Sequence, residues 1–386
     1  MVELLKNWKG TLKIKELNVS HKIYKELIFD KFYKLIDEQS FTHVYEYPRG
    51  SNPCIEVTNL ISGLKFLSDS KILENITEIF INDCTDINEI IKYKDEFISL
   101  KKIKNRDWSK GQLITQTDLK MLLSNFPKIE FLNIWTDYLI TDFDFSILPE
   151  LKYLNLYINF NIKFENLIEI NNTYFQPLID LLPKTIETLY LSLPYFNCVL
   201  PELPKLKKIG VKTIYYIWRY GDDNIKLKNT MELFTKSLPP GLTSLIINIP
   251  YFDGEIPELP FLSKLVISSK LFTKPLNLKA PLKEFKLYCK NFNHSLHFPD
   301  TTKEILLYRY YPDKTKTIHA PSVEIAVLEM DDNLFFDTIE NGGFANLKEI
   351  ILPMFGHVDE FEAEVQKFLP ECEVSETYNI DDVELY

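Results

Sequence analysis

The side chains that could carry chemistry are few and widely spaced in this chain. His294 and His297 form an H-x-x-H pair, but no Glu lies between them and Cys289 is the one cysteine nearby. A zinc site needs three or four nitrogen or sulfur ligands at short, characteristic spacing. The five cysteines are scattered and form no C-x-x-C motif. We therefore interpret the histidine pair as part of a loop and expect no metal site.

Motifs for catalysis or cofactor binding are also missing from the sequence. Neither G-x-G-x-x-G nor G-x-x-x-x-G-K-[ST] occurs among the 11 glycines, so no loop is predicted to cradle a phosphate group. The six histidines offer no obvious partner for a nucleophilic Ser or Cys. The pairs Asp331-Asp332 and Asp381-Asp382 lack the ligand spacing of a calcium loop. The sequence predicts a protein that is not an enzyme, with no catalytic residues and no cofactor.

Composition and charge exclude further classes of protein. The chain has 386 residues, of which 45% are hydrophobic and 26% charged, and these values are typical of globular proteins. Lys+Arg 44 against Asp+Glu 55 gives a net charge of −11, which argues against a general nucleic-acid binder. No signal peptide is visible, and no apolar run approaches the ~20 residues of a membrane helix. Because the five cysteines are scattered and form no paired motif, we expect a cytoplasmic or nuclear protein without a membrane segment.

A repeated apolar pattern predicts the elements that position the remaining side chains. Segments of the form apolar-x-x-apolar-x-apolar recur along most of the chain, and we call their three apolar positions anchors. Three successive steps between first anchors, from Leu242 to Thr302, are 20 residues each. The pattern occurs at Ile76-Ile79-Ile81, Ile129-Leu132-Ile134, Leu151-Leu154-Leu156, Ile186-Leu189-Leu191, Leu206-Ile209-Val211, Leu242-Leu245-Ile247, Leu262-Leu265-Ile267, Leu282-Phe285-Leu287, Thr302-Ile305-Leu307, Val323-Ala326-Leu328 and Leu347-Ile350-Leu352, with Leu100-Ile103 as a weaker copy.

An internal duplication supports this alignment of the repeats. The segment "LPKTIETLYLSLPYF" from Leu182 is a near copy of "LPPGLTSLIINIPYF" from Leu238. Their continuations, from Leu200 and from Ile256, match at the same offset of 56 residues. That offset equals one long step plus one step of 20 residues, so this part of the chain is interpreted as a duplicated two-repeat unit.

The pattern resembles the leucine-rich-repeat family, L-x-x-L-x-L-x-x-N/C-x-L over about 20–29 residues. The resemblance implies an α/β repeat fold, a curved leucine-rich-repeat solenoid over residues 51–370 with a parallel inner sheet. Steps of 20 residues leave too little chain for long helices, so short helical, 3₁₀ or extended backs are expected. The family's Asn or Cys at the ninth position is mostly absent. The ninth residue is Cys84 in one repeat and Asn159 in another. In four other repeats it is Pro194, Pro250, Lys270 and Tyr310.

Two early repeats resemble the cysteine-containing subtype of this family, in "ITEIFINDCTDI" with Cys84 and in Ile140-Thr141-Asp142. That subtype is common in F-box leucine-rich-repeat proteins, the substrate receptors of cullin–RING ubiquitin ligases. The segment Val19–Ile36 is similar to the second half of an F-box, whereas the L-P-x-E-I/L of the first half is missing. Residues 1–50 are thus predicted to be a helical segment. It is either a cap on the first repeat or a degenerate F-box that binds a cullin–RING adaptor.

The C-terminal end of the array shows a second capping pattern. Val358, Phe361, Val365 and Phe368 lie at helical spacing before Pro370, which predicts a capping helix. Residues 371–386 are then predicted to form an acidic, mobile tail.

Strand alternation predicts which side chains face a partner. The third, fifth and seventh residues of each repeat point to the concave face, away from the anchors. Because this face carries aromatic side chains that the core does not need, it is typical of a partner surface. The predicted residues are Phe131, Asn133, Trp135, Tyr153, Asn155, Tyr157, Thr188, Tyr190 and Ser192, beside the basic Lys102, Lys104 and Arg106.

The predicted function is therefore a protein–protein interaction module, with a protein partner on the concave face that carries acidic residues. Its most concrete form is an F-box-like substrate receptor of a cullin–RING ubiquitin ligase, and the alternative is a leucine-rich-repeat scaffold with no ubiquitin role. For the face itself two alternatives stay open: N-terminal sequence covers it, or it is a surface without a partner.

Overall fold

The computed structural model describes most of the repeat array and two short stretches before it. The described residues are 10–14, 42–45, 54–57, 60–69, 71, 73–81, 86–105, 115–136, 143–158, 171–193, 196–213, 231–313, 315–330, 332–353 and 358–377. The chain divides into two compact units. Unit 1 holds residues 1–162 and 180–186, and unit 2 holds residues 163–179 and 187–386.

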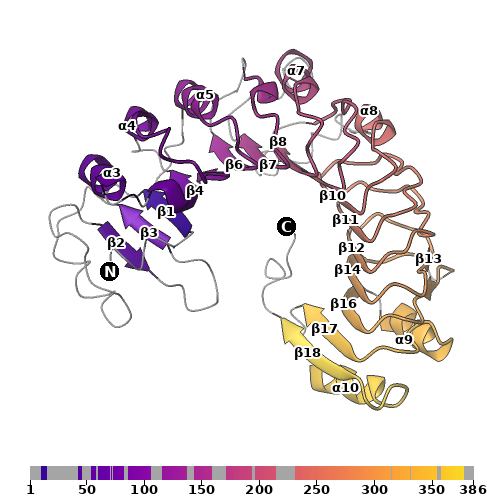
Figure 1. Ribbon diagram of the computed structural model, residues 1–386. Coiled ribbons are helices and arrows are strands. Elements are labelled where there is room, and N and C mark those ends of the chain that lie inside the picture. Colours follow the sequence, from indigo (N-terminus) through magenta and orange to yellow (C-terminus); the bar gives the residue numbers. More distant parts are fainter. Residues whose placement is uncertain are drawn as a thin grey trace, which may run out of the picture. The chain divides into compact units, whose positions relative to one another are not determined.

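Unit 1 is a sheet with short helices in the connections between its strands (Figure 1). In space the strands follow the order β2, β3, β1, β4, β5, β6, β7, and all neighbours are parallel except β2 and β3. The strands are β1 (Gly10–Ile14), β2 (Thr42–Tyr45), β3 (Cys54–Val57), β4 (Ile76–Ile81), β5 (Lys102–Asn105), β6 (Phe131–Thr136) and β7 (Tyr153–Ile158). The helices are α3 (Leu60–Asp69), α4 (Ile87–Lys92) and α5 (Gln116–Asn125), with 3₁₀ turns at Leu73–Asn75 and Phe145–Ile147.

Unit 2 is a parallel sheet whose main strands lie in chain order. They are β8 (Thr188–Leu193), β9 (Lys208–Thr213), β10 (Ser244–Asn248), β11 (Lys264–Ser268), β12 (Glu284–Tyr288), β14 (Glu304–Tyr310), β16 (Ile325–Met330), β17 (Glu349–Pro353) and β18 (Glu373–Thr377). A small separate sheet pairs β13 (Leu296–His297) with β15 (Ile318–His319). The helical elements are a π-helical turn at Asn171–Phe175, α7 (Gln176–Asp180), α8 (Glu232–Lys236), α9 (Asp332–Glu340) and α10 (Val358–Val365).

The anchors form the core of both units, as the repeat pattern predicts. Within unit 2 the second anchors align residue by residue across neighbouring strands. That row runs Leu189, Ile209, Leu245, Leu265, Phe285, Ile305, Ala326 and Ile350, and every member is buried. A parallel α/β repeat sheet with few and short helices is therefore confirmed.

The backs of the 20-residue repeats are extended, as their length predicts. Between β10 and β14 the chain has no helix in residues 249–303, all of which are described. Three aromatic rings fill the space instead, one from each successive repeat. Phe272 stacks on Phe252 with ring centroids 5.5 Å apart, and on Phe292 at 5.7 Å, with interplanar angles of 7° and 2°.

The Asn or Cys that the family has at the ninth position is mostly absent here. A polar side chain or a thiol at the eighth position takes over its hydrogen bonds. Ser269 Oγ donates to the carbonyl oxygens of Phe252 at 2.7 Å and Pro250 at 3.1 Å. In the next repeat, the buried Cys289 Sγ donates to the Phe272 carbonyl at 3.1 Å. These short side chains satisfy turn carbonyls that would otherwise be buried without a donor.

Strand β14 of unit 2 contains an irregularity in its pairing. The pairing of β14 with β16 shifts register between Tyr308 and Tyr310, and Arg309 has a positive φ of 58°. The extra residue turns the Tyr310 ring into the core, where it is fully buried and its hydroxyl donates to the His294 carbonyl at 2.6 Å. Burial raises the pKa of Tyr310, so this hydroxyl keeps its proton and remains a donor.

At the two ends the structure corrects the prediction. Residues 1–50 are predicted to be helical, yet 10–14 and 42–45 form strands β1 and β2, and Leu12 lies in register between Ile55 and Ile79. The F-box-like segment Val19–Ile36 lies outside the described residues. At the other end, β18 adds a strand inside the predicted tail 371–386. Its register places Glu371 and Glu376 at two of three anchor positions, so the apolar pattern does not reveal it. The predicted helix forms as α10, but β18 follows it, so α10 connects two strands and does not end the array.

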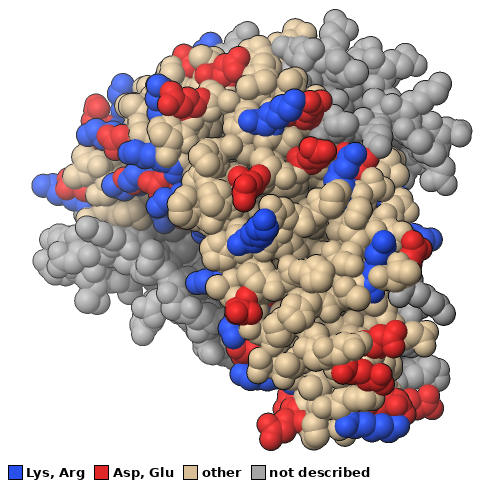
Figure 2. Space-filling model, turned by 90° about the vertical axis from the view of Figure 1, so that its right-hand side faces the viewer, with Lys and Arg blue, Asp and Glu red and all other residues tan. Residues whose placement is uncertain are grey.

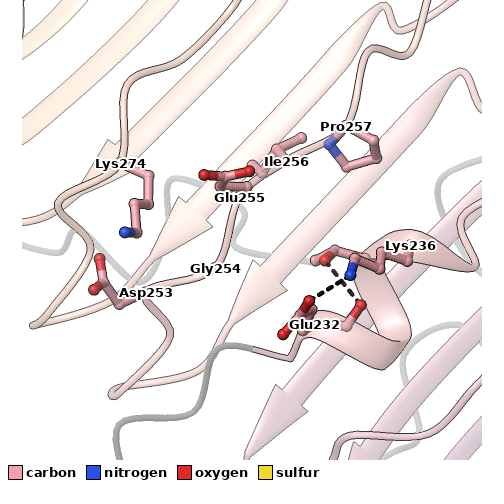
Figure 3. Close-up of a pocket in the computed structure, with 9 residues that line it drawn as sticks. Glu232, Lys236, Asp253, Gly254, Glu255, Ile256, Pro257 and Lys274 are labelled. Carbon is pink, nitrogen blue, oxygen red and sulfur yellow. Dashed lines mark hydrogen bonds and ion pairs between the residues drawn. The ribbon is translucent and has the colours of Figure 1, made fainter.

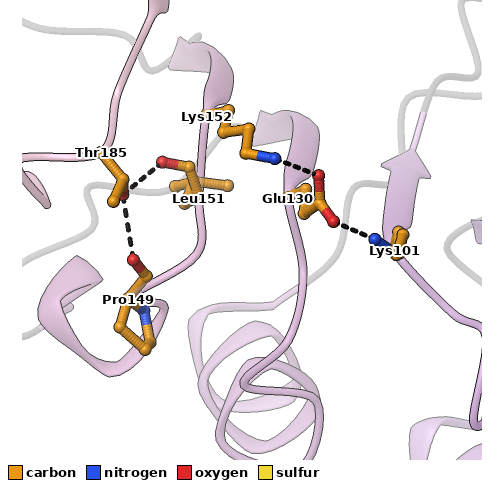
Figure 4. A network of polar contacts seen from close by, with 6 residues as sticks. All are labelled: Lys101, Glu130, Pro149, Leu151, Lys152 and Thr185. Atoms are coloured by element: carbon orange, nitrogen blue, oxygen red, sulfur yellow. Dashed lines mark hydrogen bonds and ion pairs between the residues drawn. The ribbon is translucent and has the colours of Figure 1, made fainter. Parts of the chain in front are cut away.

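Charged side chains beside the first anchors join successive repeats. In unit 1, Glu130 accepts hydrogen bonds from Lys101 and Lys152, the latter at 2.7 Å between Nζ and Oε2 (Figure 4). Thr185 Oγ1 donates to the carbonyl of Leu151 at 2.7 Å in the same row. In unit 2, Glu324 lies between Lys303 and Lys348 in the same arrangement, with both distances 2.7 Å. Each glutamate thereby links three repeats.

The pairing of Glu324 with two lysines predicts an acid-sensitive contribution to stability. Hydrogen bonds from Lys303 and Lys348 lower the pKa of Glu324 from 4.5 to about 2. Since a lowered folded-state pKa stabilises only while the group is ionised, the contribution is full above pH 4.5 and is lost as pH falls toward 2. The free-energy difference between wild type and Glu324→Gln, measured by urea unfolding, should shrink between pH 6 and pH 3. The exposed Glu258→Gln should show no such trend.

The anchor row predicts a large effect for a single buried charge. Leu245 is fully buried between Ile209 and Leu265. Leu245→Asp should lower the free energy of unfolding by about 4 kcal/mol or more, because an ionised carboxylate has no partner there. Urea unfolding followed by circular dichroism measures it. Leu233→Asp, at a half-exposed position on α8, is the matched control and should change stability little. Equal midpoints for the two variants would contradict the alignment.

Candidate functional site

Two stacked aromatic pairs mark the outward face of β6 and β7. Phe131 stacks on Tyr153 and Trp135 stacks on Tyr157, each with ring centroids 4.0 Å apart and planes within 9° of parallel. The pairs form because the strands are parallel and in register, with Phe131 opposite Tyr153 and Trp135 opposite Tyr157. We call the side of β5, β6 and β7 that carries these four rings, Asn133 and Asn155 the aromatic face. The rings are half-buried, in contrast to the buried anchors Leu132 and Leu154.

A buried asparagine holds the end of β6. Asn105 occupies the third anchor position of its repeat, which explains why the apolar pattern is weak there. Its Nδ2 donates to the Trp135 carbonyl at 2.8 Å, and its Oδ1 accepts from the Trp135 backbone N–H. The side chain thus replaces a strand-to-strand pairing and fixes the backbone that presents the Trp135 ring.

The predicted basic row is less positive than its sequence suggests. Lys104 Nζ pairs with Glu78 Oε1 at 3.1 Å and lies 5.2 Å from the Phe131 ring centroid. Lys102 is exposed, 6.0 Å from the same ring centroid. Arg106 lies outside the described residues. Much of the Lys104 charge is therefore compensated within the protein, and Lys102 is the described member of the row that is open to a partner.

The two asparagines form the middle row of the aromatic face. Asn133 lies in register between Lys104 and Asn155, flanked along β6 by the side chains of Phe131 and Trp135. Its Oδ1 is buried, and no donor in the described part of the chain reaches it. A buried acceptor without a donor is costly, and because this oxygen exposes almost no surface, a partner can reach it only if neighbouring side chains move.

Tyr190 belongs to unit 2 and stands on β8. Its ring lies over Gly210 of β9: a Cβ at Gly210 would be 2.5 Å from Tyr190 Cδ1. Partial burial raises the pKa of Tyr190. The ring therefore fills the space that a glycine leaves on the neighbouring strand, a role that strand alternation alone does not indicate.

A separate cavity of about 360 Å³ lies in unit 2, between α8 and the loops after β10 and β11 (Figure 3). Its charged residues are Glu232, Lys236, Asp253, Glu255 and Lys274. A hydrogen bond from Lys236 lowers the pKa of Glu232, so that carboxylate is paired and ionised. Asp253 Oδ1 accepts from the backbone N–H and hydroxyl of Thr273 at 2.8 and 2.7 Å, which ties it to the turn. The lining contains no His, Ser or Cys.

His294, His297, His319 and Cys289 make local contacts in unit 2. His294 Nε2 contacts the Thr273 carbonyl at 2.8 Å, and the rings of His297 and His319 lie 6.3 Å apart across β13 and β15. Burial raises the pKa of the Cys289 thiol, so it stays protonated. Among the described residues, no three His, Cys, Asp or Glu side chains gather as metal ligands do.

One side of the molecule carries mixed charge. On the side shown in Figure 2, Lys and Arg are interspersed with Asp and Glu, and broad areas are uncharged. No helix in the described part of the chain combines the length and the apolar character that a bilayer span requires.

The sequence of this chain matches no protein-family model, and none of the curated proteins is detectably similar to it.

The packing of Tyr190 on Gly210 generates a test. Gly210→Ala should displace the ring and lower the free energy of unfolding by about 1–3 kcal/mol, because the added methyl group overpacks the site. Nitration of Tyr190, followed by mass spectrometry, should increase as the ring moves out. Gly241→Ala is the control: nothing lies within 4 Å of its Cβ, so it should stabilise slightly, by about 0.4–1 kcal/mol. Unchanged nitration in Gly210→Ala would refute the packing.

Proposed function

We propose that this protein is a non-enzymatic protein–protein interaction module of the leucine-rich-repeat type, and that the aromatic face binds its partner. The two stacked aromatic pairs carry the proposal. Four large rings stand on adjacent strands, opposite the anchors, at positions that the core does not require.

The geometry of the rings favours binding over a purely structural role. Stacked pairs are held in one orientation before a partner arrives, so little side-chain entropy is lost on binding. A few such rings dominate the binding energy of many interfaces. The row of Asn133 and Asn155 between the pairs adds hydrogen-bonding groups, which supply orientation and specificity rather than area.

The chemistry of the face suits a partner that combines apolar side chains with a hydrogen-bond donor and one or two carboxylates. Lys102 is the described cation best placed for a carboxylate, since Lys104 already pairs with Glu78. Because the net basic charge of the face is small, ionic strength should affect association moderately.

The most concrete form of this function is an F-box-like substrate receptor of a cullin–RING ubiquitin ligase. Its support is the sequence of Val19–Ile36 and of the two early repeats that resemble the cysteine-containing subtype. In the alternative, a leucine-rich-repeat scaffold, the aromatic face binds a partner and no ubiquitin ligase takes part.

Affinity purification of the tagged chain from the cells that express it tests both forms. Partners captured by wild type should be lost in Trp135→Ala and in the double variant Tyr153→Ala/Tyr157→Ala. The expected loss of affinity is roughly 30-fold, about 2 kcal/mol. The control is Phe261→Ala, an equally large change at an exposed ring of unit 2. It should retain the partner.

Stability measurements separate a binding role from a core role. Each ring removed should cost about 0.5–1.5 kcal/mol for the lost stack, well below the 3–5 kcal/mol of a fully buried ring. Retained capture in a stable Trp135→Ala variant would reject the partner site. If mass spectrometry of the captured proteins shows no cullin–RING adaptor while a partner is present, the receptor form fails and the scaffold form stands.

A further inference from the structure

The small sheet of β13 and β15 places two histidines side by side on the back of unit 2. β13 lies in the connection from β12 to β14, and β15 lies in the connection from β14 to β16, so the sheet joins two successive repeats (Figure 1). His297 is opposite His319 in the register of this parallel pair. Because the preceding residues, Leu296 and Ile318, are buried, strand alternation directs both imidazole rings outward, and both histidines are exposed.

Backbone hydrogen bonds fix the separation of the two histidines. The Leu296 N–H donates to the Thr317 carbonyl at 2.9 Å, and the Phe298 N–H donates to the His319 carbonyl at 2.8 Å. Leu296 and Phe298 are buried on either side of His297. Since paired parallel strands lie about 4.8 Å apart, the backbone needs no rearrangement to bring both rings to one ligand.

The two rings are close together, and their nitrogen atoms are available. The ring centroids of His297 and His319 are 6.3 Å apart, with 45° between the ring planes. Within the described part of the chain, no hydrogen bond engages either ring. His294, by contrast, contacts the Thr273 carbonyl through Nε2 at 2.8 Å. The structure therefore pairs His297 with His319, whereas the H-x-x-H spacing of the sequence pairs it with His294.

The spacing of the rings suits a metal ion that is held by one nitrogen from each. Zinc binds imidazole nitrogen at about 2.0–2.1 Å, so two rings on a tetrahedral ion have centroids about 5 Å apart. Rotation of the exposed side chains about their Cα–Cβ and Cβ–Cγ bonds closes the remaining difference of about 1 Å. Neutral imidazole is a good ligand for Zn²⁺, Ni²⁺ and Cu²⁺, whereas Mg²⁺ and Ca²⁺ prefer oxygen ligands.

The surroundings of the pair define the kind of site. No three His, Cys, Asp or Glu side chains of the described residues gather around one point, so water fills the remaining positions around an ion. In tightly held metal sites, a ligating histidine usually donates its second ring nitrogen to a carboxylate or a carbonyl. Neither ring has such a partner in the described part of the chain. A bound ion should therefore exchange with the solution and be removed by a chelator.

We propose that His297 and His319 form an exchangeable surface site for a divalent transition metal, with one ring nitrogen from each histidine as ligand. The bound ion connects the backs of the two repeats that contain β13 and β15. Because the two histidines come together only in the folded sheet, metal binding stabilises the folded state of unit 2. The proposal is independent of the aromatic face of unit 1.

Isothermal titration calorimetry of the full chain tests the site, after dialysis against EDTA and then against metal-free buffer. Ni²⁺ should bind wild type at one ion per chain, and Mg²⁺ should not bind. His297→Asn and His319→Asn should each weaken Ni²⁺ binding by about 100-fold, because the second imidazole no longer binds the same ion. His294→Asn is the matched control and should retain the wild-type affinity. Retained affinity in His297→Asn or His319→Asn would overturn the proposal.

Unfolding by urea provides a second measurement. Saturating Ni²⁺ should raise the midpoint of wild type and leave that of His319→Asn unchanged, and EDTA should reverse the rise. In EDTA the two chains should have the same circular dichroism and the same midpoint, since an exposed side chain contributes little to stability. An equal rise of the midpoint in both chains would place the metal elsewhere and reject the pair.

Electron paramagnetic resonance of bound Cu²⁺ counts the ligands directly. The spectrum should show coupling to two imidazole nitrogens in wild type and to at most one in His319→Asn. Coupling to a single nitrogen in wild type would contradict the shared site.

Discussion

The row of buried anchors is the constraint on which the other features depend. Leu245 is typical: it lies opposite Ile209 on one side and Leu265 on the other, and all three are buried. Because every second residue of a strand then points the opposite way, the same register decides which residues stack on the outward face. Phe131 meets Tyr153, and Trp135 meets Tyr157, only because Leu132 meets Leu154. A shift of one residue would bury the rings and expose the leucines.

Much of the architecture can be predicted from the apolar anchors, since their energy comes from burial and their spacing is explicit. The same method misses β18, where Glu371 and Glu376 occupy anchor positions at the last strand of the described sheet. At β18 the anchor row has a neighbouring strand on one side only, so its anchor positions are less buried and need not be apolar. The strands β1 and β2 are missed for a different reason, because they are isolated from the repeat spacing.

The candidate site is predictable in part. Alternation along the strands identifies Phe131, Trp135, Tyr153 and Tyr157 as outward residues, and their pairing then follows from the register. The ion pair between Lys104 and Glu78 cannot be predicted from alternation, because it depends on which repeat lies beside Lys104. Asn105 looks like a defect in the apolar pattern, yet its two hydrogen bonds to Trp135 make it a support for the site. The packing of Tyr190 over Gly210 does not follow from alternation either, since it depends on a glycine in the neighbouring strand.

The bulge at Arg309 has a consequence for how the chain finds its register. Successive repeats between β10 and β14 are so alike that a strand displaced by one whole repeat would still place apolar residues in the core. Such translational degeneracy is a hazard in arrays of similar units, where neighbouring modules can exchange partners during folding. The extra residue at Arg309 and the hydroxyl of Tyr310, bonded to the His294 carbonyl, fit only one neighbour. These two features make the native alignment of the repeats lower in free energy than alignments that are shifted by one repeat.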